Sequence, residues 1–220
     1  MSMSSIAASP GPRERILDAA EELFARRGYS GIGMREVAET AGLGKSSLFH
    51  HFHSKAELYL AVALRRLEAF EQRLNEALAA GGSPRERLDR WIDTVIDMLA
   101  DDDRAARLLL RSLFEEDDAD LAALAAADPR ADASTERIIR ALARLLHEGI
   151  EAGEFRPASI PHTVQSIIGL TVYPFASGDF GDQILGRSPF SRSEVKRRKQ
   201  EVRGLLHGGI VARDGAGRSD

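Results

Sequence analysis

Apolar residues recur along most of the chain at the spacing of one face of a helix. The clearest example lies in segment 33–41, whose apolar positions follow i, i+3, i+4 and i+7: Met34, Val37, Ala38 and Ala41. A glycine-bearing turn at 42–44 then interrupts the pattern. A second short helix is predicted over 45–52, with Leu48 and Phe52 on its inward face.

The opposite face of this second helix is unusual for a solvent-facing surface. Hydroxyl, aromatic and imidazole side chains again follow a helical spacing there: Ser46, Phe49, His50 and His53. A short helix that presents such groups just after a tight turn suits the major groove of DNA. The pattern therefore predicts a helix-turn-helix and a DNA-binding regulator.

The same helical period covers most of the remaining chain. It predicts further helices over 13–27, 54–80, 85–101, 104–114, 135–152, 161–176 and 191–211. Serine followed three residues later by glutamate, a capping box, marks the starts near Ser54, Ser83 and Ser191. No alternation typical of a strand is present. The prediction is an all-α protein of about nine helices.

The segments between these helices divide the chain. Alanine and aspartate dominate 115–134, which we expect to be a mobile connection, and 177–189 is expected to be a glycine-rich loop. The predicted organisation is a disordered tail over 1–12, a helix-turn-helix DNA-binding domain over 13–53, a connecting helix over 54–80, and a helical ligand-binding and dimerisation domain over 83–213.

Composition removes several classes of protein. With 43% apolar residues, the 220-residue chain can bury a substantial core, yet no apolar run approaches the roughly 18 residues that a membrane span needs. The start of the sequence lacks the basic and apolar regions of a secretory signal. Cysteine is absent, which excludes disulfides and thiolate metal sites. We expect a cytoplasmic protein with no membrane partner.

If the chain binds DNA, its basic side chains must be concentrated at the contact surface, because they are not in excess overall. The net charge is −4, and residues 1–60 hold as many acidic as basic side chains. Arg35, Lys45 and Lys55 flank the predicted turn and helix. The acidic side chains of the same segment would have to face away from the nucleic acid.

The first 60 residues resemble the TetR family of bacterial transcriptional regulators in order, spacing and residue type. The matching segments are RILDAA at 15–20, LF at 23–24, RGY at 27–29, MREVA at 34–38, AGL at 41–43, KSSLFHHF at 45–52 and SK at 54–55. The resemblance implies three N-terminal helices containing the helix-turn-helix, then a ligand domain of about six helices. It also implies a dimer formed through the last two helices, and release from operator DNA by a small molecule.

The resemblance also assigns roles to individual positions. Five residues correspond to the recognition helix: Lys45, Ser46, Ser47, Phe49 and His50. Lys55 corresponds to a lysine that contacts phosphate, and Arg35 to an arginine near the DNA backbone or adjacent groove. Gly33 and Gly44 stand where the family usually has Ser or Thr, so these two helix caps offer no hydroxyl to a phosphate.

The residues themselves leave alternatives for this surface. Phe49 either covers a thymine methyl or a sugar, or packs sideways onto its own domain, and the lysines either position DNA phosphates or are merely solvated. The histidines near residue 50 are too close in sequence to share one helical face, so no metal is expected. Gly44-Lys45-Ser46 is not a phosphate loop, because Glu39 occupies the position of its first glycine. No cofactor is expected.

Beyond residue 83 the candidates are a ligand cavity and a dimer interface. The residues predicted to line the cavity are Trp91, Met98, Arg111, Phe114, Leu142 and Tyr173. The alternative is that these side chains belong to a filled helical core. Arg111 either faces an anionic group of the ligand or is exposed and paired with Glu115. The interface prediction names Val164, Ile167, Ile168, Thr171, Val202, Leu205 and Leu206. The basic run at 196–199 is expected to be a solvated face, with a second nucleic-acid patch as the alternative.

The favoured function is a ligand-responsive repressor that binds a pseudo-palindromic operator on double-stranded DNA as a homodimer. Two copies are expected because one neutral domain would bind DNA weakly, and a dimer sets two recognition helices one DNA turn apart. An activator of the same fold remains open, as does a helical small-molecule carrier that binds no operator. An enzyme is not expected, since neither Glu-x-x-His nor a nucleophile elbow occurs. The effector is unknown.

Overall fold

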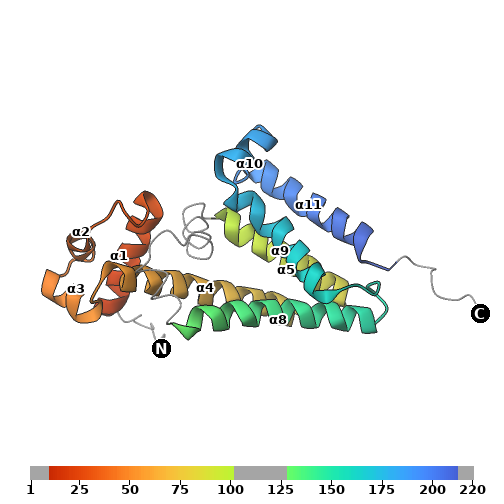
Figure 1. The fold of residues 1–220 in the computed structure, drawn as a ribbon, viewed down its shortest axis with the longest axis horizontal. Helices are drawn as coiled ribbons and strands as arrows, with labels where there is room; N and C mark the ends of the chain where they lie inside the picture. Colours follow the sequence, from red (N-terminus) through yellow and green to blue (C-terminus); the bar gives the residue numbers. More distant parts are fainter. Residues whose placement is uncertain (1–9, 102–127, 213–220) are drawn as a thin grey trace, which may run out of the picture.

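The protein is an elongated all-α molecule, as the sequence predicts (Figure 1). The computed structural model describes residues 10–101 and 128–212. Within these ranges lie nine helices: α1 (Pro12–Arg27), α2 (Met34–Thr40), α3 (Lys45–His51), α4 (Lys55–Ala79), α5 (Pro84–Asp101), α8 (Pro129–Glu151), α9 (Ile160–Ala176), α10 (Gly178–Leu185) and α11 (Arg192–Gly209). A single antiparallel bridge joins Phe155 and Val211, and the described residues form no longer strand.

The first three helices and the start of α4 form a compact head around their own core. Its largest fully buried side chains are Ile16, Leu17, Phe24, Leu48, Phe52 and Leu58. The predicted apolar stripe of α2 faces this core, because Val37 and Ala38 are almost completely buried. Burial of this stripe, rather than helix propensity, stabilises so short a helix.

The rest of α4 joins α5, α8, α9 and α11 in a second, larger core that we call the body. Its buried members include Leu74, Leu88, Trp91, Ile92, Ile96, Leu142, Leu145, Ile167 and Val202. Helix α5 begins with the predicted capping box. The Ser83 backbone N–H donates to Glu86 Oε2 at 3.0 Å, and the Glu86 N–H donates to Ser83 Oγ at 3.3 Å. These bonds satisfy two backbone donors that a helix start leaves unpaired.

Helices α5 and α11 are held together at successive helical turns by two ion pairs and one contact between a histidine and an aspartate. His207 Nε2 lies 2.8 Å from Asp89 Oδ1, Arg203 Nη1 lies 3.4 Å from Asp93 Oδ2, and Lys199 Nζ lies 2.5 Å from Asp97 Oδ1. Arg198 Nε donates to the Leu170 carbonyl on α9 at 3.1 Å. The expectation that 196–199 is a solvated face is therefore wrong for Arg198 and Lys199, which hold α11 to its neighbours.

Two predicted loops contain helix instead. The connection expected over 115–134 ends at Asp128, because α8 begins at Pro129 with proline in its first turn and the Asp128 side chain accepting the Arg130 N–H at 3.0 Å. The expected loop over 177–189 contains α10, which is capped at its C-terminal end by Gly186 in the left-handed conformation. The predicted helix 104–114 and most of the predicted tail 1–12 lie outside the described residues.

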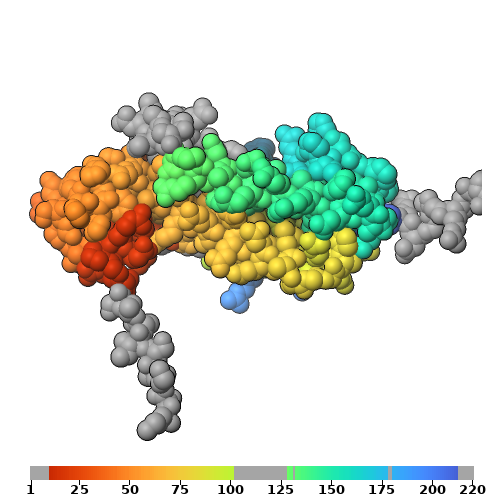
Figure 2. Space-filling model, turned by 90° about the horizontal axis from the view of Figure 1, so that it is seen from below, coloured from red at the N-terminus to blue at the C-terminus, as the bar shows by residue number. Residues whose placement is uncertain are grey.

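Helix α8 lies beside α4 along the body, and the head forms one end of the molecule (Figures 1 and 2). Arg137 on α8 bonds Glu71 on α4 through two parallel contacts, Nε to Oε1 at 2.6 Å and Nη2 to Oε2 at 2.8 Å. This bond lowers the pKa of the Glu71 carboxyl, although partial burial opposes it. No helix in the described part of the chain has the length and apolarity to cross a membrane.

Candidate nucleic-acid interface

The turn between α2 and α3 sets the direction of the second helix. Gly42 adopts a positive φ of 66°, a conformation that L side chains rarely adopt. The Leu43 N–H returns to the Ala38 carbonyl at 2.9 Å, and the Gly42 N–H to the Glu39 carbonyl at 3.1 Å. These bonds close the end of α2, after which Gly44 caps α3 through its backbone alone, without a side-chain bond.

Helix α3 has one buried face and one bare face. Leu48 is completely buried, and Phe52, just past the helix end, is 2% exposed. Lys45, Ser46 and His50 are exposed on the other side. The structure therefore brings these three predicted side chains together on a surface that the described part of the chain leaves exposed.

Phe49 and Ser47 lie at the edge of this surface rather than at its centre. Both are half-buried, and Phe49 packs against the head core. Lys45 Nζ sits 5.6 Å from the centre of the Phe49 ring, close enough for a cation–π interaction. Sideways packing onto its own domain, one of the two alternatives for Phe49, therefore holds for the buried part of the ring, and a contact of the exposed part with DNA stays a prediction.

The loop between α1 and α2 is fixed by an arginine that the sequence analysis did not single out. Arg27 Nη1 and Nη2 bond the two carboxylate oxygens of Glu36 at 2.6 and 2.9 Å, and Nε bonds the Gly31 carbonyl at 3.1 Å. A Cβ at Gly31 would lie 2.6 Å from the Arg27 carbonyl oxygen. No sequence rule links Arg27 to Glu36, because a loop of unknown path separates them.

Lys55 has an internal role that differs from the expected phosphate contact. Its Nζ donates to the Tyr29 carbonyl at 3.0 Å and to the Ile32 carbonyl at 3.3 Å, and it lies 4.2 Å from the centre of the Tyr29 ring. The ammonium thus joins α4 to the α1–α2 loop. These bonds use two of the three N–H donors of the ammonium, so the phosphate contact expected for Lys55 stays a prediction for the third.

The acidic side chains of the head are largely paired within the protein. Glu39 bonds Arg35 at 2.9 Å, Glu22 lies 3.1 Å from Arg26, and Glu36 is held by Arg27. Glu14, Asp18 and Glu21 lie against arginines of α4 instead. Arg35 remains 85% exposed despite its partner. Because Lys45 has no carboxylate partner among the described residues, this neutral head still presents a positive charge beside α3.

The candidate ligand residues do not gather in one place. Trp91 and Leu142 are buried in the body core and Met98 is half-buried, whereas Tyr173 is 54% exposed. The prediction of an inward-facing Tyr173 is wrong, because the inward positions of α9 belong to Val164, Ile167, Thr171 and Phe175. Arg111 and Phe114 lie outside the described residues. The Trp91 ring N–H is buried without an acceptor in the described part of the protein.

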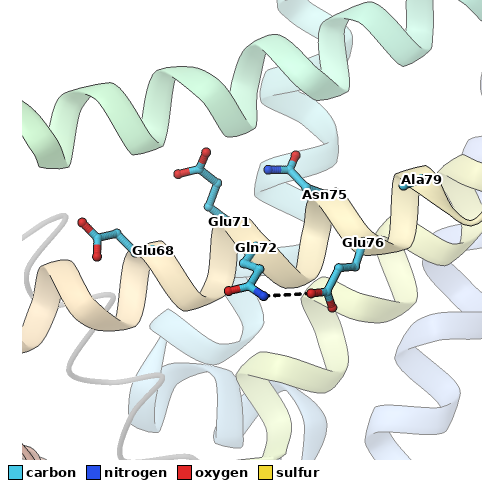
Figure 3. A pocket seen from close by; sticks show the side chains of 6 residues that line it. All are labelled: Glu68, Glu71, Gln72, Asn75, Glu76 and Ala79. Atoms are coloured by element: carbon cyan, nitrogen blue, oxygen red, sulfur yellow. Dashed lines mark hydrogen bonds between the residues drawn. The ribbon is translucent and has the colours of Figure 1, made fainter.

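Of those residues, Tyr173 borders one of the two hollows described next, whereas Trp91, Met98 and Leu142 border neither. One, of about 420 Å³, lies open along α4 between Glu68 and Ala79, where the carboxylate side chains in Figure 3 line it. Another, of about 190 Å³, lies between α9, α10 and α11 beside Tyr173, Ile184 and Leu185. No group of three or more His, Asp or Glu side chains within residues 10–101 and 128–212 could hold a metal ion.

Most residues predicted for the dimer interface are buried within the chain itself. Val164, Ile167, Thr171, Val202 and Leu206 are at most 6% exposed. Their prediction is wrong because the helical period shows which residues share a face without showing which face the chain itself covers. Ile168 is half-buried, and Leu205 is 58% exposed. The outward apolar side chains in this region are Tyr173, Phe180, Ile184, Leu185 and Leu205.

Two family models match the chain, one over the head and one over the body. Residues 16–62 match the model of bacterial regulatory proteins of the tetR family. Residues 84–205 match the model of the tetracyclin repressor-like C-terminal domain, which spans more than half of the chain.

Curated relatives match less than half of the chain. The chain is 38% identical over 105 residues to the transcriptional activator FasR of Mycolicibacterium smegmatis, covering 48% of this chain and 46% of FasR. It is 39% identical over 77 residues to the transcriptional repressor NemR of Escherichia coli, covering 34% of this chain and 39% of NemR. The aligned segments therefore span less than half of either relative.

Solved structures share the fold over almost the whole chain. The regulator FadR from Bacillus subtilis, in complex with stearoyl-CoA, superposes with a TM-score of 0.72 at 21% identity, covering 90% of this chain and 98% of FadR. AibR, in complex with isovaleryl coenzyme A and operator DNA, superposes with a TM-score of 0.67 at 19% identity, covering 89% of this chain and 97% of AibR. At these identities the likeness concerns the fold.

The position of Lys55 leads to a stability prediction. Replacing Lys55→Met removes two bonds to backbone carbonyls and should lower the free energy of unfolding by about 1–3 kcal/mol, the usual cost of losing charged hydrogen bonds. Urea unfolding followed by circular dichroism measures this loss. Lys45→Met is the matched control and should unfold like the wild type, because Lys45 is exposed. Equal stability of the two variants would contradict an internal role for Lys55.

Proposed function

The chain belongs to the tetR family of bacterial regulatory proteins, and we propose that it is a transcriptional regulator that binds operator DNA through α3. The observation that carries this proposal is the bare face of α3 opposite the completely buried Leu48, directly after the closed turn at Gly42. Lys45, Ser46 and His50 are offered there to the major groove. Ser47 and Phe49 border it, and the exposed Arg35 on α2 would reach the adjoining backbone.

We assign DNA recognition to residues 13–53, coupling to the helix over 54–80, and effector binding and dimerisation to 83–213. The regulator would act in the cytoplasm, where bacterial DNA lies. Repression is our proposed mode of action, as in the relative named NemR. The relative named FasR is an activator, so the position of the operator at each promoter decides the sign of regulation.

We further propose a homodimer formed by the outer surfaces of α9, α10 and α11. Exposed apolar side chains gather on these helices, including Tyr173, Ile184 and Leu205. Ile168 lies half-buried on α9 and would extend the contact. A two-fold pair would present two α3 helices about 34–36 Å apart, which matches one turn of DNA and implies a pseudo-palindromic operator.

The effector that we propose is an acyl-coenzyme A thioester. FadR and AibR, whose folds superpose on this chain, were solved with stearoyl-CoA and isovaleryl coenzyme A. The buried Trp91 N–H, which lacks an acceptor in the described part of the protein, offers a donor to such a ligand within the body. In this proposal the dimer has two states, one that fits the operator and one that fits it poorly. A ligand that binds more tightly to the second state would shift the dimer toward it and so release the DNA.

The DNA contact can be tested at Lys45. Lys45→Ala should weaken operator binding. It should also reduce the slope of log K against log salt concentration by about two, because each head of the dimer loses one phosphate contact. Fluorescence anisotropy over a salt series measures both effects. Arg144→Ala is the control, since Arg144 is an exposed cation on α8, and it should change neither. Binding that is insensitive to Lys45, or no selective DNA binding at all, would favour a helical carrier.

The dimer can be tested at Leu205. Leu205→Glu should give a monomer in sedimentation experiments at micromolar concentration, because the interface would have to bury an unpaired carboxylate. Ile139→Glu is the control, since Ile139 is a 40% exposed apolar side chain on α8, and it should remain dimeric. A monomeric wild type, or a Leu205→Glu variant that still dimerises, would overturn this interface.

The effector can be tested with the protein's own fluorescence, because Trp91 is its single tryptophan. Stearoyl-CoA should change the Trp91 emission and release labelled operator over the same range of concentration. Free coenzyme A and free stearate are the matched controls and should do neither. Release of DNA without any change in emission would place the ligand away from Trp91, and failure of both would contradict the acyl-CoA assignment.

A further inference from the structure

Helix α4 belongs to both cores of the molecule. Leu58, Tyr59 and Val62 pack in the head core, whereas Leu74 packs in the body core. Figure 1 shows α4 running from the head into the body as one continuous helix. The orientation of α3 relative to the rest of the protein therefore depends on how the head is held on α4.

Just beyond the last head-core residue of α4, an ionic cluster joins α4 to α1. Arg65 Nη1 lies 2.7 Å from Asp18 Oδ1 and 3.4 Å from Glu14 Oε2, and Arg65 Nη2 bonds Glu21. The neighbouring Arg66 also pairs with Glu21. The three acidic residues follow the i, i+4, i+7 spacing, so they form one face of α1 turned toward α4.

The geometry of this cluster favours a fixed angle between the two helices. Arg65 is 28% exposed and Glu21 is 16% exposed, so solvent screens their contact less than it screens a surface pair. A guanidinium that bonds carboxylates in different directions cannot rotate without losing one of them. Burial lowers the pKa of Arg65, and the bonds to Glu21 and Asp18 more than offset this, so the pKa is raised.

A second ionic contact fixes α4 on the body side. The two bonds between Arg137 and Glu71 tie α4 to α8, and Arg137 Nη2 also donates to Ser134 Oγ at 2.8 Å. Only residues 67–70, about one helical turn, separate this contact from the cluster at Arg65 and Arg66. The head-bound and body-bound parts of α4 meet within that turn.

We propose that Arg65 is the positioning residue that sets the angle of the DNA-reading head on α4, and thereby the separation of the two α3 helices in the dimer. The inference rests on the proposed function, because it concerns how an operator is read. Arg65 itself contacts no DNA. Its effect is confined to sites that two heads must occupy together.

A positioning role for Arg65 affects binding to a complete palindrome and binding to a single half-site differently. A half-site is read by one head, whose own core and α3 surface do not include Arg65. A complete palindrome requires both heads at one fixed separation, so a loosely held head must be ordered at the moment of binding. Loss of the cluster should therefore weaken binding to the palindrome and leave binding to the half-site almost unchanged.

The test compares Arg65→Gln with the wild type on an operator selected by the wild-type protein and on a DNA containing one half-site. Arg65→Gln should lose about tenfold in affinity for the palindrome, stay within about twofold on the half-site, and tolerate altered half-site spacing better than the wild type. Arg65→Lys retains the charge and should recover part of the loss. Glu22→Gln is the control, because it removes an ion pair that lies within α1.

The possible outcomes distinguish failure of the positioning role from failure of the proposed function. If Arg65→Gln loses affinity equally for both DNAs, or for neither, the positioning role is wrong while the regulator stands. If the wild type selects no DNA, the proposed function fails as well. If Arg65→Gln does not fold, Asp18→Asn weakens the same cluster from an exposed position and must give the same difference between palindrome and half-site.

Discussion

The burial of Leu48 is the constraint on which the rest of the structure depends. A helix of seven residues is too short to be stable alone, so α3 exists only while Leu48 and the adjoining Phe52 are held in the head core. Their burial also determines which side of α3 remains bare. Lys45, Ser46 and His50 face outward because the opposite side of the same two turns is fully occupied.

The positive charge beside this surface arises because the acidic side chains of the head are paired with arginines, and not because basic residues are in excess. A head with equal numbers of acidic and basic residues would attract DNA weakly if all of them were equally accessible. Here the carboxylates are engaged inside the protein, by Arg27 in the α1–α2 loop and by Arg65 on α4. The same pairs that neutralise the acids also fix the loop and the helix that support α3. Electrostatics and architecture are therefore linked in the head.

The sequence predicted the elements of the fold better than the orientation of its surfaces. Glycine turns and the serine caps marked most helix ends, because these signals are local. Helix α10 was missed because its glycines resemble a loop, and it persists here where it packs against α9. Periodicity put Val164 and Val202 on the apolar faces of their two helices without showing that these faces are internal. The roles of Lys55 and Arg65 were not predictable, since their partners lie 23–51 residues away along the chain.

In the proposed dimer, two copies of α3 read one DNA molecule together. Selection of wild-type binding sites from a random DNA pool tests this most directly, because it assumes neither an operator nor an effector. We expect enrichment of an inverted repeat whose half-site centres lie about one helical turn apart. Enrichment of isolated half-sites alone, or no enrichment over a protein lacking residues 1–53, would contradict it.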